Sequence, residues 1–181
     1  MLFITDFFFV YSFFGCVLET AFSLIVYHRL EIRKTTRFLP FCPVYGCGAL
    51  ALYYMLTPFN NYPIIVVILG TVIGTTVEYV YGYVTLKLYR VLLWDYKEEK
   101  RHYNRLITPI FTALWAALAP VFVYVISPTV TPLIAAFPEY ISYILLFLLI
   151  FDTAATIKML CKIRDGASPE SYLCPVMERV R

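Results

Sequence analysis

The chain has 181 residues, of which 61% are hydrophobic and 15% are charged, and its formal net charge is +3. A soluble domain of this size is far less apolar, and it could not bury the apolar runs in residues 7–14, 64–73 and 141–150 at once. The composition therefore excludes a soluble globular domain and predicts an integral membrane protein.

The Lys and Arg residues predict how the chain crosses the bilayer. All 15 fall within residues 29–37, 87–105 and 158–181, and apolar hairpins without bases separate these stretches. Cytoplasmic flanks of membrane helices retain Lys and Arg, so alternating basic and base-free connections indicate alternating sides. We therefore predict an all-α polytopic membrane helix bundle with five transmembrane helices, the N-terminus outside and the C-terminus inside. The bases are expected to lie beside anionic lipid rather than to bind nucleic acid, because they are scattered over several loops.

The expected spans follow from apolar length, since a helix needs about 20 apolar residues to cross a bilayer core of about 30 Å. In chain order they are residues 7–27, 43–57, 63–86, 107–126 and 140–157. The first is expected to be an uncleaved helix, because it lacks a basic n-region and contains Glu19. The second is short, and a re-entrant loop is the alternative; a true crossing is preferred because it keeps residues 87–105 inside. Residues 1–163 thus form the bundle, and 164–181 form a cytoplasmic tail.

The connections expected outside are residues 58–63 and 127–138, which are short and rich in turn-forming residues, and the outer acids are Asp6 and Glu139. The five cysteines have neither the spacing nor the neighbouring His residues of a zinc site. We interpret them as small packing residues, and we expect no metal and no cofactor.

Two acids inside the predicted spans are the main candidates for a functional site. Glu19 precedes Arg29 by ten residues and Glu78 precedes Lys87 by nine, so both lie about 13–15 Å inside the cytoplasmic edge. Their two spans run in the same direction, so the carboxyl groups can share one layer. An acid in a span costs about 2.5–3.5 kcal/mol and usually faces the bundle interior or a cavity.

These acids allow two interpretations. In the first they form a cytoplasm-facing polar pocket for a cation, a proton or a polar headgroup. In the second each acid is protonated and only forms a hydrogen bond to another helix. The second is preferred for Asp152, which lies near the end of the last span.

Small residues recur on the same helix faces as the two acids. In the third span Gly70, Gly74 and Gly82 share a four-residue spacing with Glu78, and Gly15 lies four residues before the acid of the first span. Such stripes allow a neighbouring helix to approach closely. We therefore predict close helix packing at these glycines.

Further candidates lie at the cytoplasmic surface. Tyr45 is expected either to point its hydroxyl group toward the acids or to anchor its helix at the interface. Trp94 and Tyr96 are typical interface anchors, and Asp95 between them is expected to form a salt bridge within the basic loop. Asn104 is a candidate N-cap of the fourth span. No catalytic residue is predicted. The residues predicted to bind a ligand are Glu19, Glu78, Tyr45, Trp94, Asp95, Tyr96 and Asn104.

Four separated motifs resemble those of the CmpB-type ABC-transporter type IV family. They are Tyr-Ser-Phe-Phe-Gly-Cys-Val-Leu-Glu ending at Glu19, Pro-Phe-Cys-Pro-Val-Tyr-Gly-Cys-Gly-Ala beginning at Pro40, Glu78-Tyr-x-x-Gly82 and Trp94-Asp-Tyr96. They occur in the same order over about residues 7–127. The resemblance implies a small bacterial multi-pass membrane protein. The family's Asn-Gly-Arg turn before the fourth span is Asn104-Arg105-Leu106 here, so the geometry of that turn is not carried over.

The preferred function is a transport-related protein of the bacterial cytoplasmic membrane. The chain contains no Gly-x-x-x-x-Gly-Lys-[Ser/Thr] loop, so an ABC role would require a separate ATPase or another membrane subunit. Five spans are few for a carrier that acts alone, and we expect a homo-oligomer. A membrane scaffold or assembly protein is the alternative. An intramembrane lipid-processing enzyme is less favoured, because no nucleophile has an adjacent base and no metal-binding set occurs.

Overall fold

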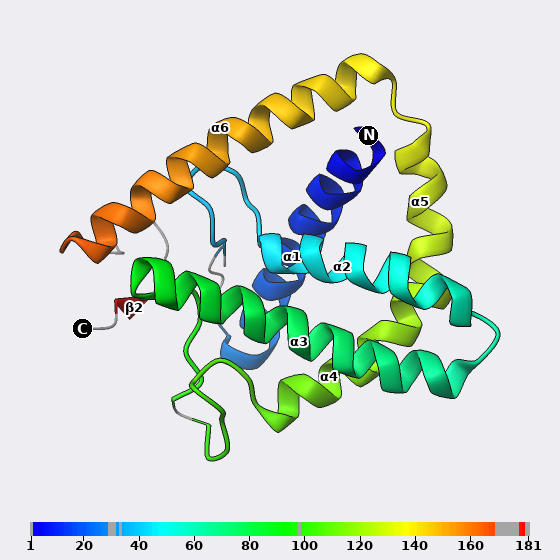
Figure 1. Cartoon of the computed structure of the whole chain (residues 1–181), viewed down its shortest axis with the longest axis horizontal. Coiled ribbons are helices and arrows are strands. Elements are labelled where there is room, and N and C mark those ends of the chain that lie inside the picture. Colours follow the sequence, from blue (N-terminus) through cyan, green and yellow to red (C-terminus); the bar gives the residue numbers. More distant parts are fainter. Residues whose placement is uncertain (1, 29–31, 33, 98, 169–177, 180–181) are drawn as a thin grey trace.

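A computed structural model describes residues 2–28, 32, 34–97, 99–168 and 178–179, and Figure 1 shows the arrangement of its elements. In chain order these are α1 (Leu2–Tyr27), α2 (Pro43–Leu56), a 3₁₀ turn (Thr57–Phe59), α3 (Pro63–Tyr89), β1 (Val91–Leu92), α4 (Pro109–Val121), a π-helical turn (Phe122–Ile126), α5 (Ser127–Ala135), α6 (Glu139–Arg164) and β2 (Glu178–Arg179).

The predicted all-helical membrane fold is confirmed. Within the described residues, four helices are long and apolar enough to cross a membrane: Leu2–Val26, Pro63–Tyr89, Pro109–Ala135 and Glu139–Arg164. Helix α2 has 14 residues, which corresponds to about 21 Å and is shorter than a bilayer core of about 30 Å. The expected second span is therefore a helix with nearly the predicted bounds, but it is shorter than a typical transmembrane helix.

Proline marks the start of three helices. Pro43, Pro63 and Pro109 stand at the first positions of α2, α3 and α4, where a missing N–H group leaves no hydrogen bond unmade. The N-cap of α4 is Thr108, whose Oγ1 accepts a hydrogen bond from the backbone N–H of Phe111 at 3.3 Å. The prediction that Asn104 caps this helix is wrong, because the chain makes a tight turn before the helix begins.

Residues 127–135 correct the predicted boundary of the fourth span. They were expected to belong to an outer connection, yet they form α5 and continue the helix of α4 through the π-helical turn. The connection to α6 is reduced to residues 136–138. Pro120, Pro128 and Pro132 remove backbone donors along this helix and bend it, and in Figure 1 α5 runs in a different direction from α4.

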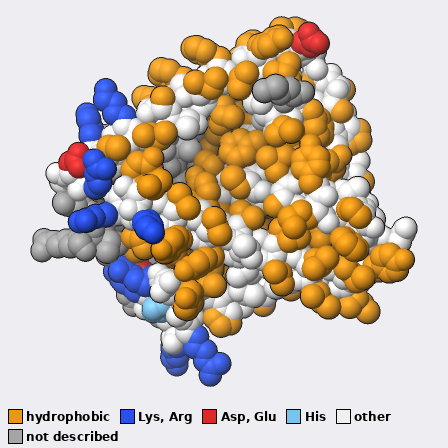
Figure 2. Space-filling view, in the orientation of Figure 1, with side chains coloured by type: hydrophobic (Ala, Val, Ile, Leu, Met, Phe, Trp, Pro, Cys, Tyr) orange, Lys and Arg blue, Asp and Glu red, His pale blue; other side chains and the backbone are white. Residues whose placement is uncertain are grey.

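The main core lies between α1, α2, α3 and α4, and the π-helical turn and α5 add to it. Consecutive helices pack in the pairs α1–α2, α2–α3 and α3–α4. Their apolar side chains meet at fully buried Phe7, Leu56, Val66 and Ala119. Helix α6 lies along one side and packs mainly against α1. On the face shown in Figure 2, hydrophobic side chains cover most of the surface away from the basic end, as expected for contact with lipid.

Lys and Arg gather at the end of the molecule where α3 and α6 finish (Figure 2). Here β1 pairs antiparallel with β2, with Val91 opposite Arg179. A second small core forms beneath this pair from Val91, Leu93, Met159 and Ile163. The ends of α3 and α6 are thereby joined at the basic face.

The loop between α1 and α2 is held against α6. The backbone N–H of Phe38 donates to Asp152 Oδ1 at 2.7 Å, and that of Arg37 donates to Thr156 Oγ1 at 2.9 Å. Asp152 is fully buried, so its carboxylate satisfies the backbone of this loop. We predicted that Asp152 forms only a structural hydrogen bond to another helix. The hydrogen bond is structural, but its donor is in the loop between α1 and α2 and not in a helix.

Asp6 belongs to α1, although the predicted first span begins one residue after it. Helix α1 begins at Leu2, and Asp6 is buried between α1 and α6, where Ser142 Oγ donates to its Oδ2 at 2.5 Å. Its Oδ1 has no hydrogen-bond partner among the described residues. The helix starts a turn earlier than the apolar run indicated, because Leu2 to Thr5 continue it.

Candidate functional site

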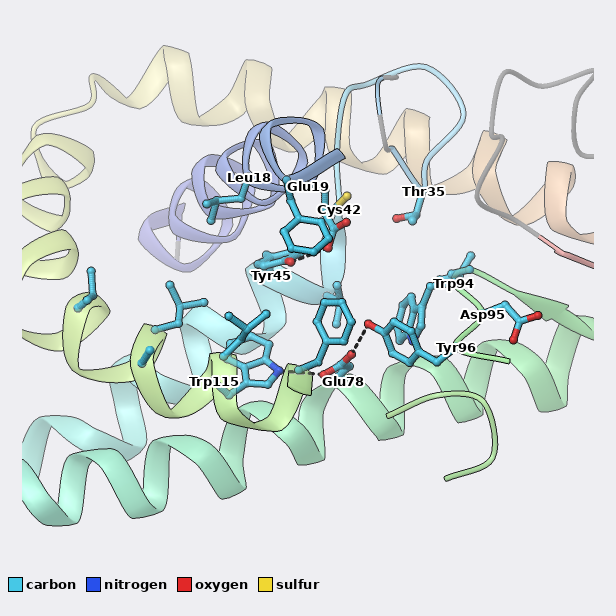
Figure 3. Close-up of a pocket in the computed structure, with 18 residues that line it drawn as sticks. Leu18, Glu19, Thr35, Cys42, Tyr45, Glu78, Trp94, Asp95, Tyr96 and Trp115 are labelled. Carbon is cyan, nitrogen blue, oxygen red and sulfur yellow. Dashed lines mark hydrogen bonds between the residues drawn. The ribbon is translucent and has the colours of Figure 1, made fainter. Parts of the chain in front are cut away.

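A cavity of about 440 Å³ lies between α1, α2, α3, α4 and the loop that follows β1 (Figure 3). This volume is within the usual range of small-molecule sites, about 300–1,000 Å³. Its described lining consists of Leu18, Glu19, Phe22, Thr35, Cys42, Val44, Tyr45, Glu78, Leu93, Trp94, Asp95, Tyr96, Phe111, Leu114, Trp115, Ala117, Leu118 and Val121. Aromatic and aliphatic side chains form most of the wall, and a few polar groups lie among them.

One side of the cavity is built by α1 and α2. Tyr45 Oη donates a hydrogen bond to Glu19 Oε1 at 2.7 Å. The Tyr45 ring lies directly on Gly15, where a Cβ atom would overlap the tyrosine side chain. The glycine thus allows α2 to approach α1, and this approach places the tyrosine hydroxyl at the carboxylate.

The opposite side is built by α3, α4 and the loop after β1. Glu78 is 7% exposed and accepts two hydrogen bonds, from Trp115 Nε1 at 2.9 Å and from Tyr96 Oη at 3.0 Å. The indole of Trp115 lies on Gly74, where a Cβ atom would overlap the ring. Close packing of α3 and α4 therefore places the indole donor at the acid one turn further along α3.

The loop after β1 has a defined conformation because several contacts hold it. Trp94 Nε1 donates to the carbonyl of Leu106 at 2.9 Å, and its ring packs over Gly82. Asp95 forms a two-point ion pair with Arg105, with Nε to Oδ1 at 2.8 Å and a second contact from Nη2 to Oδ2. The predicted salt bridge of Asp95 is therefore present.

The turn before α4 holds the partner of Asp95. Asn104 and Arg105 both have left-handed backbone angles, with φ of 52° and 64°, as in a type I′ turn. The backbone N–H of Leu106 donates to the carbonyl of Tyr103 at 3.0 Å and closes the turn. A glycine would adopt these angles more easily, and the ion pair is a contact that glycine could not make.

Aromatic rings connect the two carboxyl groups. The rings of Tyr45 and Trp115 have centroids 6.2 Å apart, so the hydrogen-bond partners of the two acids touch. On the other side of Glu78, Tyr96 stacks on Phe111 with centroids 4.6 Å apart and an angle of 21° between planes. Such rings attract cations at their faces.

The charged side chains in the described lining of the cavity are acidic, and one of them, Asp95, is paired with Arg105. This lining contains three carboxylic acids and no Lys, Arg or His. In the part of the chain that the structure describes, the groups that contact the Glu78 carboxyl are neutral donors and no ion pair with it is formed. At Glu78 this arrangement favours a proton or a cation over an anion.

The structure places most of the predicted site residues together. Glu19, Tyr45, Glu78 and the residues 94–96 all line the cavity. Asn104 is not part of the lining, and its Nδ2 donates to the hydroxyl of Tyr79 at 3.1 Å.

The predicted packing glycines lie where other elements approach closely. Gly15 faces α2, Gly70 and Gly74 face α4, and Gly82 faces Trp94 and Leu106 in the segment between β1 and α4. At Gly70 the neighbouring atom is the Cβ of Ala119.

Two residues that the sequence analysis did not single out, Trp115 and Phe111, complete the site. Tryptophan in a membrane helix is usually found at the interface, whereas Trp115 lies in the middle of the predicted span 107–126. This unusual position was a signal that the indole has a polar partner in the bundle. No comparable signal marks Phe111, because phenylalanine is common throughout a span.

The described residues include no group of three or more His, Cys, Asp or Glu side chains that could hold a metal ion. Cys16 and Cys42 are buried, Cys47 and Cys161 are half-buried, and these four are free thiols. Cys174 lies outside the described residues.

Comparison with protein families identifies the chain. Residues 7–157 match the family described as "Putative ABC-transporter type IV". The chain belongs to this family. The match extends through α6 and so covers more of the chain than the four motifs noted in the sequence, and it agrees with the apolar helices in indicating a membrane protein. Searches of curated proteins and of solved structures gave no match for this member of the ABC-transporter type IV family.

Proposed function

We propose that the chain is the membrane component of a transport system, and that a cation or proton binds between Glu19 and Glu78. The observation that supports this most directly is the environment of Glu78. Its carboxyl group is buried beside a cavity, its contacts among the described residues are the neutral donors of Tyr96 and Trp115, and a second acid lies in the same lining. Buried acids in membrane spans commonly mark pathways of ions or protons.

The cavity is proposed to face the cytoplasm of a bacterial cell membrane. Residues 94–96 in its lining belong to the basic loop, and bases mark the cytoplasmic side. In the proposed topology the N-terminus is outside and the C-terminus inside. The short helix α2 counts as a fifth crossing, which places the basic ends of α1, α3 and α6 on one side.

The source of energy is proposed to be a separate ATPase, and the chain is proposed to act as a homo-oligomer or with another membrane subunit. The family description supports a place in an ABC system. The large area of exposed apolar side chains on α6, including Phe147 and Ile150, leaves room for lipid or another membrane chain.

Transport is best tested in inside-out vesicles from host cells that lack the gene and carry a replacement copy. Proton, sodium and potassium fluxes are followed with ion-sensitive dyes, with and without ATP. We expect a flux that depends on the wild-type chain, is lost with Glu78→Gln and is retained with Glu139→Gln, a matched change at an exposed acid. Equal fluxes with and without the chain would refute transport of these three ions, and a wild-type flux with Glu78→Gln would exclude this acid from the pathway.

A scaffold function is the second candidate, and the glycine contacts favour it. Gly15 and Gly74 allow close helix packing that would serve an assembly role as well as a binding site. A scaffold would keep its function in Glu78→Gln and lose it when packing at Gly74 is disturbed. The same vesicles, compared with a growth assay of the host strain, distinguish the two functions.

A further inference from the structure

Two cysteines lie close together where α2 begins beside α1. Cys16 is part of α1, and Cys42 is the N-cap residue of α2. The backbone N–H of Cys42 donates to the carbonyl of Ser12 at 3.0 Å. In an α-helix the N–H of Cys16 donates to the same carbonyl, because it lies four residues after Ser12. The two backbone nitrogens are therefore within about 6 Å of each other, which is twice the length of a backbone hydrogen bond.

The side chains of these two cysteines are also in contact. The thiol of Cys16 forms a hydrogen bond with that of Cys42. Their exposed fractions are 3% and 2%, so the surrounding bundle holds both side chains in place. A disulfide requires Cα atoms about 4.4–6.8 Å apart and sulfur atoms about 2.05 Å apart. The shared carbonyl and the contact between the thiols are compatible with such a bond after a small movement of the sulfur atoms.

The two thiols differ in access and in electrostatic surroundings. Cys42 belongs to the described lining of the cavity, and Cys16 does not (Figure 3). Cys42 also stands at the N-terminus of a 14-residue helix, where the partial positive charge of the helix stabilises a thiolate. A small uncharged reagent in the cavity therefore meets Cys42 first, and Cys16 is placed to react second.

We propose that Cys16 and Cys42 form a redox-active dithiol, which hydrogen peroxide oxidises to a disulfide. The sulfur of Cys42, after loss of its proton, attacks one oxygen of the peroxide and breaks the O–O bond. Cys42 becomes a sulfenic acid, and the other oxygen leaves with the thiol proton as water. The sulfur of Cys16 then attacks the sulfur of Cys42, and the sulfenic hydroxyl group leaves with the Cys16 proton as a second water molecule. Two thiols thus lose two electrons and two protons, and one peroxide is reduced to two water molecules.

The disulfide would act on the wall of the cavity that holds Glu19. Glu19 follows Cys16 by three residues and Tyr45 follows Cys42 by three, so the hydrogen bond from Tyr45 to Glu19 lies one turn from the sulfur atoms. Drawing the sulfur atoms to bonding distance changes the spacing of α1 and α2 at this point. The dithiol is therefore placed to sense peroxide and to alter the cavity. This inference goes beyond the proposed function and holds whether or not the chain transports an ion.

Tryptic mapping can test the disulfide, because trypsin cleaves at the bases that lie between the two cysteines. The full chain in phosphatidylcholine nanodiscs is reduced with dithiothreitol, separated from the reductant and treated with hydrogen peroxide. Remaining thiols are blocked with N-ethylmaleimide as the chain is unfolded for digestion. We expect mass spectrometry to find the peptide that contains Cys16 linked to the peptide that contains Cys42, and we expect dithiothreitol to remove the link.

Cys47 requires a control, because trypsin leaves it on the same peptide as Cys42. Cys47→Ser changes a cysteine of α2 outside the described lining, and this variant should form the link as the wild type does. Cys16→Ser and Cys42→Ser should both lose the link.

The order of the two steps has its own test. Dimedone, a cyclic diketone, reacts with sulfenic acids and leaves a stable adduct. In Cys16→Ser the second step is blocked, and we expect peroxide to produce a dimedone adduct on Cys42. In Cys42→Ser we expect no adduct on Cys16 above that of the untreated chain, because Cys16 lies outside the described lining.

Three results would overturn the inference. The first is a wild-type chain in which peroxide does not link Cys16 to Cys42, and this result does not depend on the folding of any variant. The second is a link that persists in Cys42→Ser, which would assign the bond to Cys47. The third is an adduct on Cys16 in Cys42→Ser at the level seen for Cys42 in Cys16→Ser, which would show that the cavity does not select the thiol that reacts.

Discussion

Replacing Gly74 with Ala is expected to lower the free energy of unfolding by about 2–3 kcal/mol. A Cβ atom at this position would overlap the indole of Trp115 and would lie 2.7 Å from its Cγ. The indole must move away from α3, and its Nε1 then moves away from the Glu78 carboxyl to which it now donates at 2.9 Å. One methyl group therefore disturbs both helix packing and the site.

The magnitude follows from three contributions. Overpacking of a well-packed interior costs about 1–3 kcal/mol, and the overlap with a whole ring places this substitution near the upper value. The lost hydrogen bond to Glu78 costs about 1 kcal/mol or more. Alanine recovers about 1 kcal/mol, because it is a better helix former than glycine.

Gly48→Ala is the matched control. Gly48 on α2 faces the same indole, but a Cβ atom there would lie 3.3 Å from Cη2, so a shift of a few tenths of an ångström accommodates it. We expect a change in stability within about 1 kcal/mol of zero, since the gain in helix propensity offsets the small shift.

The assay is unfolding in mixed detergent micelles, followed by far-ultraviolet circular dichroism for the helices and by tryptophan emission for the site. Gly74→Ala should shift the unfolding midpoint and the emission maximum together. The reasoning is refuted if Gly74→Ala unfolds like wild type with unchanged emission, or if Gly48→Ala is destabilised to the same extent.

Three further changes test contacts outside the cavity. Asp152→Ala removes the acceptor of a backbone N–H in the loop between α1 and α2, and we expect trypsin to cleave that loop about tenfold faster or more, whereas Asp152→Asn keeps an acceptor oxygen and serves as the control. Arg105→Ala and Arg105→Gly both remove the ion pair with Asp95, but alanine keeps a Cβ atom at a φ of 64°, where a side chain is strained. In thermal unfolding, the alanine variant should therefore be about 1 kcal/mol less stable than the glycine variant. Ser142→Ala leaves the buried Asp6 without its hydrogen-bond donor and should destabilise the chain by about 1–3 kcal/mol in the same assay; no loss of stability would show that this contact is not formed.

Helix positions could be predicted from local sequence because their determinants are local. Apolar runs of sufficient length indicated the long helices, and the observed starts at Pro43 and Pro63 coincide with the predicted ones. The proximity of Glu19 and Glu78 was also predictable, since similar numbers of residues separate each acid from the next basic residue in helices expected to run in the same direction. Both acids line one cavity as that spacing suggested.

The errors arose where the bilayer or a distant contact changes a local rule. Residues 127–135 contain prolines that end helices in water, but a chain surrounded by lipid retains as many helical hydrogen bonds as it can, and the helix continues there. Within this helix the Thr129 hydroxyl also donates to the carbonyl of Val125, one turn earlier, at 2.8 Å.

The partners of Asp6, Asp152 and Trp115 could not be predicted from local sequence for a different reason. Ser142 is 136 residues from Asp6, Phe38 is 114 residues from Asp152, and Trp115 is 37 residues from Glu78. A pattern within one helix shows that a polar group needs a partner, but it does not show which helix supplies it.

The position of α6 has a consequence for biosynthesis. Among the described helices it is synthesised last, and it supplies the partners of groups made much earlier, through Ser142 near its start and Asp152 at its middle. Until α6 inserts, the carboxylate of Asp6 and the backbone N–H of Phe38 in a nascent chain therefore lack these hydrogen-bond partners. Completion of these two contacts thus waits for the insertion of α6, and a quality-control protease would find its targets in the interval before it.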